Sequence, residues 1–183
     1  MRRLIFIITA ILAAISILLY YPLSPETLPS AIQSMSPFPS TTPLSVTDPV
    51  TYSHYFYHSH RENEDGHFHV FVSDADQSIH AHLIGISLDK HRMPISLFVT
   101  APWVTGEEVI SADVLLNTFS LTDHTPENRW MKRLFDTYRN EIAQLLERRD
   151  AYRTPVFGRH EIIAEIKIQP SLHALSAETN QKE

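Results

Sequence analysis

The chain has 183 residues and a mass of 21.0 kDa, which suits one compact domain with appended segments. Its 15 Lys and Arg against 21 Asp and Glu give a formal net charge of -6, which excludes a nucleic-acid-binding protein built on a basic patch. The lack of cysteine excludes disulfides, thiolate metal sites and cysteine nucleophiles, whereas histidine is abundant, with 11 residues.

The N-terminus predicts a membrane anchor over residues 1–21. Two arginines precede 18 uncharged residues, Leu4–Tyr21, which as a helix would span roughly 27 Å, about one hydrocarbon thickness. The arginines favour a cytoplasmic N-terminus, so we expect a single-pass protein whose C-terminal domain lies outside the cytoplasm, in the periplasm of a bacterium. A cleaved signal peptide and a buried helix are the alternatives.

A linker is predicted over residues 22–49. Seven of the 12 prolines fall there, interleaved with serine and threonine, and glycine is absent. Such a composition buries too little apolar surface to offset the entropy of ordering, and it favours polyproline II. The alternative is an irregular arm packed along the domain through Leu44, Val46 and Val50.

The folded domain is predicted over residues 50–170, beginning with four strands. Alternating residues mark strands at 52–60 and 67–72, and the short polar turns that follow delimit two more at 79–88 and 94–100. Short loops between successive strands predict an antiparallel meander.

Helices are predicted to follow the meander. A short helix carries Val114, Leu115 and Phe119, and a long one spans residues 126–150, with Thr125 as its N-cap. A last strand alternates over residues 162–168, and a flexible tail begins at residue 171. We therefore predict an α+β fold, an antiparallel sheet covered by one long and one short helix, with an N-terminal transmembrane helix.

The histidines form the most informative pattern. Eight of the 11 lie between positions 54 and 91, and three sets have the form His-x-His, which places both rings on one face of a strand. The simplest hairpin registers pair His58 with His69 and His69 with His82, which gives a row across three strands. In those registers His60 faces His67 beside the row.

Converging neutral imidazoles on a rigid sheet are suitable ligands for a divalent metal ion, with Zn²⁺ the first choice. The predicted ligands are His58, His69 and His82, supported by His60 and His67. Glu62 and Glu64, in the adjoining loop, are candidates for a catalytic base or a carboxylate that orients a ligand. The alternatives are a metal-free hydrogen-bonded cleft and a polar sheet face with a structural role only.

Three residues elsewhere are weaker candidates. Trp103 and Glu107 follow the fourth predicted strand, where loop residues often build sites, and Glu107 is a further candidate base. Trp103 is also suited to filling the core. Arg129, near the start of the long helix, is a candidate for binding an anionic ligand, or for a surface ion pair.

Several sequence segments resemble a bacterial family of domains of unknown function. They are Tyr55–His60, Gly66–Phe71, His82–Asp89, Leu97–Thr100, Trp103–Glu107 and Asn128–Trp130. The resemblance covers roughly residues 52–168 and implies a shared fold and a shared histidine-lined site, with no assigned activity. The anchor and the linker look like additions to that family.

Two functions are therefore expected for a membrane-anchored domain. In the first, the histidine face binds a divalent metal, and metal-assisted hydrolysis is the enzymatic form of this function. In the second, the domain is a non-catalytic module that binds a small molecule or a protein and responds to pH through its histidines. The membrane, through residues 4–21, is the one partner that the sequence indicates.

Overall fold

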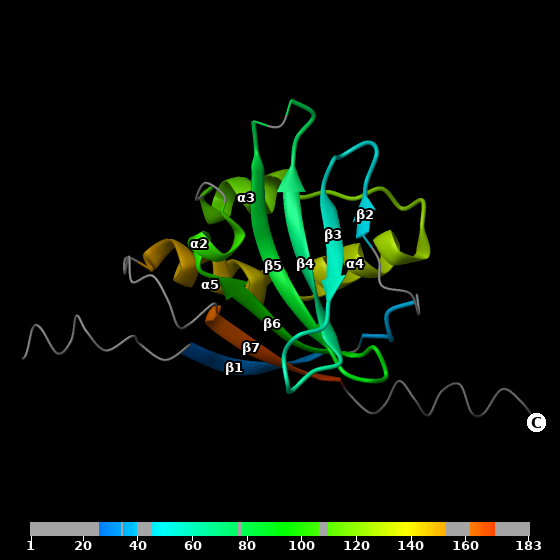
Figure 1. Ribbon diagram of the computed structural model, residues 1–183, viewed down its shortest axis with the longest axis vertical. Helices are drawn as coiled ribbons and strands as arrows, with labels where there is room; N and C mark the ends of the chain where they lie inside the picture. Colours follow the sequence, from blue (N-terminus) through cyan, green and yellow to red (C-terminus); the bar gives the residue numbers. More distant parts are fainter. Residues whose placement is uncertain are drawn as a thin grey trace, which may run out of the picture.

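A computed structural model of the chain describes residues 26–33, 35–39, 45–76, 78–106, 110–152 and 162–170. Within these ranges the domain contains one sheet of seven strands, in the order β1-β7-β6-β5-β4-β3-β2 (Figure 1). The strands are β1 (Glu26–Gln33), β2 (Ser45–Thr47), β3 (His54–His58), β4 (Gly66–Ser73), β5 (His80–Leu88), β6 (Pro94–Thr100) and β7 (Ile162–Pro170).

The predicted meander is confirmed. Strands β3, β4, β5 and β6 follow one another as antiparallel neighbours, β2 extends them on one side, and β7 pairs antiparallel with β6. β1 then joins β7 in parallel. The helices within the described ranges are α2 (Pro102–Thr105), α3 (Ala112–Thr118), α4 (Pro126–Thr137) and α5 (Arg139–Ala151), so the α+β class is also confirmed.

The predicted long helix is divided at Tyr138. Thr125 caps α4 as expected, since its hydroxyl accepts from the backbone N–H of Asn128 at 3.1 Å. Tyr138 leaves helical geometry, with φ −110° and ψ 25°, and α5 begins at the next residue. Because the Tyr138 side chain is fully buried, the bend lies against the core, and both helices turn apolar residues toward the sheet.

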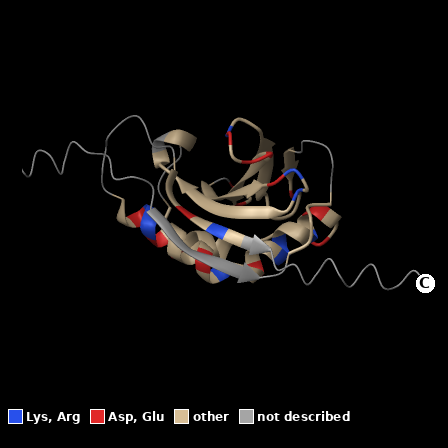
Figure 2. Ribbon diagram, turned by 90° about the horizontal axis from the view of Figure 1, so that it is seen from below, with Lys and Arg blue, Asp and Glu red and all other residues tan. Residues whose placement is uncertain are grey.

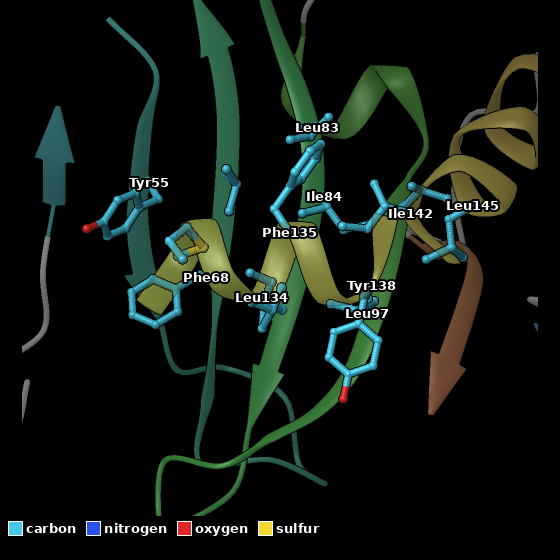
Figure 3. Close-up of a cluster of buried hydrophobic side chains, with 14 of the residues drawn as sticks. Tyr55, Phe68, Leu83, Ile84, Leu97, Leu134, Phe135, Tyr138, Ile142 and Leu145 are labelled. Atoms are coloured by element: carbon cyan, nitrogen blue, oxygen red, sulfur yellow. The ribbon is translucent and has the colours of Figure 1, made fainter. Parts of the chain in front are cut away.

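Helices α4 and α5 cover one side of the sheet (Figure 2). Between the two layers lies a continuous core, in which Tyr55 and Phe68 from the sheet meet Leu134 and Ile142 from the helices (Figure 3). Leu97 and Tyr138 lie in the same layer. The opposite side of the sheet is therefore free to carry polar side chains.

The predicted linker is wrong for the part of residues 22–49 that the structure describes. β1 and β2 lie in it, and Met35 and Phe38 are buried. The Phe38 ring packs on Phe68 at 4.6 Å and on Trp130 at 5.1 Å between centroids. Prolines are tolerated in an edge strand such as β1, so a proline-rich composition did not exclude a packed segment.

Other predictions concern residues outside the described ranges. These are the membrane anchor or signal peptide over residues 1–21 and the flexible tail over residues 171–183. Among the helices that are described, none combines the length and apolarity needed to cross a bilayer.

Candidate functional site

The side of the sheet away from α4 and α5 carries a patch of aromatic and imidazole rings. In the centre of this patch His67 and His69 of β4 and His82 of β5 are 1%, 9% and 4% exposed. Toward one rim His54 stacks on Phe71, with 4.7 Å between centroids and planes 4° apart. Most of the ring contacts link different strands, so the patch is a product of the sheet's assembly.

The strand register differs from the prediction. His58, not His60, faces His67, because β3 ends at His58 and the loop begins two residues earlier than expected. The loop is closed by the Ser59 hydroxyl, which donates to the Asp65 carbonyl at 2.7 Å. A shift of two residues keeps every side chain on its face, so the histidines still share one side.

A β-bulge changes the second pairing. The register of β4 and β5 shifts between Val70 and Phe71, so His82 faces Phe71 instead of His69. The rings of His69 and His82 nevertheless meet diagonally, with centroids 5.0 Å apart, and His58 lies 5.4 Å from His69. The three predicted rings therefore are neighbours, through a geometry that the simple register did not contain.

Hydrogen bonds join the rings of His67, His69 and His82. We call these three residues the imidazole row. Nε2 of His67 lies 3.2 Å from Nε2 of His69, and Nδ1 of His69 lies 3.0 Å from Nε2 of His82. Glu64 contacts Nδ1 of His67 at one end, and Thr100 lies 3.3 Å from Nδ1 of His82 at the other. The row thus runs from a loop carboxylate to a strand hydroxyl.

One arrangement of protons satisfies the whole row with neutral rings. An ionised Glu64 accepts from Nδ1 of His67, which leaves Nε2 of His67 to accept from His69. Nδ1 of His69 then accepts from His82, and Nδ1 of His82 accepts from the Thr100 hydroxyl. This assignment follows from the network, because the tautomers are set by their partners.

The electrostatics keep His69 and His82 neutral. Burial, reinforced by the neighbouring His67 and His58, lowers the pKa of His69 to about 3. Burial also lowers the pKa of His82 well below its ordinary value, with His69 and Arg149 adding to the effect. Burial alone would raise the pKa of Glu64, but the hydrogen bonds from His67 and Ser87 outweigh it and lower that pKa.

Arg61 closes the loop over the row. Its guanidinium donates to Glu64 at 2.9 Å and to the Ser87 hydroxyl at 3.1 Å. It also lies 4.8 Å from the centre of the Phe98 ring, a cation–π contact. Phe98 in turn meets His67 edge-on, with 5.5 Å between centroids, so it forms a wall of the site.

Gly85 makes room for that wall. A Cβ at position 85 would lie 2.2 Å from the Phe98 ring. We expect Gly85→Ala to displace Phe98 and to lower the free energy of unfolding by about 2 kcal/mol, the usual scale of overpacking. Urea denaturation measures the change. Restoring the space with Gly85→Ala/Phe98→Leu should recover part of the loss, and a Gly85→Ala variant as stable as wild type would contradict this packing.

The other predicted residues are distributed as follows. His60 is exposed, with its ring 4.8 Å from that of His67, and Glu62 is exposed in the loop. Arg129 lies on α4, on the other side of the sheet, and donates to the Asp123 carbonyl at 2.8 Å. Trp103 belongs to α2, and its side chain is outside the described part, as is the whole of Glu107.

Two residues at the buried end of the row were missed. Thr100 meets His82 from β6, and Arg149 of α5, only 6% exposed, donates to the His82 carbonyl at 3.3 Å. Arg149 also donates to the Ile110 carbonyl and pairs with Asp150. Nothing in the sequence indicated a role for Arg149 at this site, because a basic residue in the last turn of a helix is usually explained by the helix dipole.

The described side chains do not form a complete metal-binding cage. Among the residues that the structure describes, no group of three or more His, Asp or Glu side chains is arranged to hold a metal ion. The imidazole row presents two ring nitrogens toward each other, Nε2 of His67 and Nε2 of His69.

Comparisons with known proteins identify a family match. The family model described as "Domain of unknown function (DUF6969)" matches residues 23–162. No curated protein and no solved structure matches the chain. The match includes most of residues 22–49, so the proline-rich segment is part of the family's domain and not an addition to it.

Proposed function

Because the chain belongs to the DUF6969 family, whose description assigns no activity, we propose a function from the imidazole row. The domain binds one divalent metal ion, with Zn²⁺ preferred, through Nε2 of His67 and Nε2 of His69. The observation that carries this proposal is the 3.2 Å between these two atoms. Two nitrogens bound at about 2.0–2.1 Å to a tetrahedral ion lie about 3.3 Å apart.

The partners of both rings support metal binding. A histidine that binds a metal commonly donates its other N–H to a carboxylate or a similar acceptor, which fixes the ring. Glu64 holds Nδ1 of His67 in this way. When the ion binds Nε2 of His69, the tautomers of His69 and His82 reverse relative to the metal-free row: Nδ1 of His69 donates to Nε2 of His82, and Nδ1 of His82 donates to the Thr100 hydroxyl. His82, predicted as a ligand, is therefore proposed to orient His69 instead. One of the two histidines whose rings contact His67, His58 or His60, supplies the third ligand by turning toward the ion.

The pKa shifts favour metal binding over a switch in mild acid. A metal takes the neutral form of imidazole, and the pKa of His69, lowered to about 3, keeps its ring neutral throughout the physiological range. A sensor of mild acid would need central histidines that gain a proton between about pH 5 and 7. Such an ion, bound with one position open to water, would lower the pKa of that water and supply the hydroxide that hydrolysis requires.

Metal titration tests this function. The full chain, stripped with EDTA and dialysed, is titrated with ZnSO₄ in a calorimeter, and elemental analysis gives the stoichiometry. We expect one Zn²⁺ per chain, a loss of affinity of about 100-fold or more in His67→Ala and His69→Ala, and a loss of roughly tenfold in Glu64→Gln.

The control is His124→Ala, because His124 is exposed and lies outside the patch. It should bind Zn²⁺ as wild type does, and circular dichroism checks that each variant is folded. A folded wild-type chain that binds no Zn²⁺, or a His69→Ala variant with undiminished affinity, would exclude the proposed site.

A further inference from the structure

A small cavity extends the site across the sheet beyond the imidazole row. Its volume is about 330 Å³, at the lower end of small-molecule sites. Its lining includes His60, Arg61 and Glu64 from the loop and Ser87, Ser96 and Lys167 from the sheet. We call it the Ser96 cavity. Glu64 is the shared wall, since one carboxylate oxygen contacts His67 and the other accepts from Arg61.

The floor of the Ser96 cavity is built by strand pairing. His67 faces Ser87, Ser87 faces Ser96, and Ser96 faces Lys167, across β4, β5, β6 and β7. The Ser87 hydroxyl already has a hydrogen-bond partner, because it accepts from the Arg61 guanidinium. The Ser96 hydroxyl is different: the residue is 1% exposed, and its oxygen has no hydrogen-bond partner within the described part of the chain. A buried hydroxyl without a partner is costly, so a bound group is expected to use it.

Two cations in the lining converge on one carboxylate. Oε1 of Glu165 lies 2.9 Å from the Lys167 ammonium and 3.8 Å from the Arg61 guanidinium. The Glu165 side chain is 16% exposed and the Lys167 side chain 51%. The Arg61 contact is too long for a direct hydrogen bond, so Glu165 holds this position with one good partner only.

We propose that the Ser96 cavity binds a small organic molecule through a carboxylate group, which takes the place of Glu165 between Arg61 and Lys167 and accepts a hydrogen bond from Ser96. A single negative charge suits the lining better than a dianion, because Glu62 and Glu64 already lie beside the two cations. The site uses neither His67 nor His69 as a ligand, so it stands independently of the metal.

Binding is measured with butyrate, its methyl ester and inorganic phosphate as probes. The full chain is kept in EDTA, and the backbone amide signals of ¹⁵N-labelled protein are followed by NMR during each titration. We expect butyrate to cause saturable chemical-shift changes that centre on the amides of β6 and β7. The ester and phosphate should bind with at least tenfold lower affinity. The use of EDTA separates this result from the metal proposal, which is tested with Zn²⁺ alone.

Three variants assign the contacts. Ser96→Ala and Lys167→Gln should each weaken butyrate about tenfold, the scale of a hydrogen bond to a charged group. Glu165→Gln should tighten it several-fold, because the competing charge is removed. Lys132→Gln is the matched control, since Lys132 pairs with Asp123 on the helical side. Equal affinity for butyrate and its ester, unchanged binding in Ser96→Ala, or no tightening in Glu165→Gln would each overturn the proposal.

Discussion

Replacing Asp48 with alanine is expected to lower the free energy of unfolding by about 4 kcal/mol, the scale seen when a buried charged network loses its centre. Asp48 is fully buried. Its carboxylate accepts from the backbone N–H groups of Val50 and Thr51, from the backbone N–H and hydroxyl of Thr122, and from the Asn128 amide, at 2.6–3.0 Å.

The expected loss of stability is large because the Asp48 carboxylate connects separate parts of the fold. It links the turn after β2 to the start of α4, and Asn128 passes the connection on by accepting from the Tyr55 hydroxyl at 2.9 Å. Burial alone would raise the pKa of Asp48, but the hydrogen bonds from Thr122, Thr51 and Val50 outweigh it and lower that pKa. The carboxylate is thus held ionised, and its removal leaves buried donors without an acceptor.

Urea denaturation of Asp48→Ala measures this loss against a matched control. Asp74 is also a turn aspartate, accepting from the Ile79 N–H and the Ser78 hydroxyl, but all of its partners belong to its own hairpin. Asp74→Ala should therefore cost much less than Asp48→Ala. Equal losses in the two variants would show that the connection from Asp48 to α4 contributes nothing beyond a local turn.

The sequence predicted those parts of the fold that depend on neighbouring residues. Strands β3 to β6 are short runs rich in aromatic and apolar residues bounded by polar turns, and the cap formed by Thr125 and Pro126 is local, so both could be recognised directly. β1 could not. It pairs with β7, more than 130 residues away, and the segment after it is held by contacts such as Phe38 on Phe68 and Trp130 on the Ser36 carbonyl.

The same distinction holds for the candidate site. The spacing of His67 and His69 places both rings on one face of β4 whatever the register, and Glu64 lies only three residues from His67. The contact of His69 with His82 depends on a bulge, and Thr100 and Arg149 arrive from other elements. A bulge inserts one residue without a strong sequence signal, so the row's true hydrogen bonds required coordinates.

The metal-free chain is expected to lose stability steeply as the pH falls from 7 to 4.5. Unfolded histidines take up a proton near pH 6.5, whereas the folded pKa of His69 is lowered to about 3 by burial. Between these values the unfolded state binds more protons, so the free energy of unfolding decreases as the pH decreases. His69 alone contributes roughly 2–3 kcal/mol of loss at pH 4.5, and His82 acts in the same direction.

Urea denaturation in EDTA at a series of pH values measures this slope. Each buried histidine that stays neutral adds about 1.4 kcal/mol per pH unit. His82→Gln should therefore flatten the pH dependence by about that amount, even though the variant is less stable at pH 7. His124→Gln removes an exposed histidine and should leave the slope unchanged. Identical slopes for wild type and His82→Gln would mean that His82 is protonated in the folded chain, and the neutral row would then be wrong.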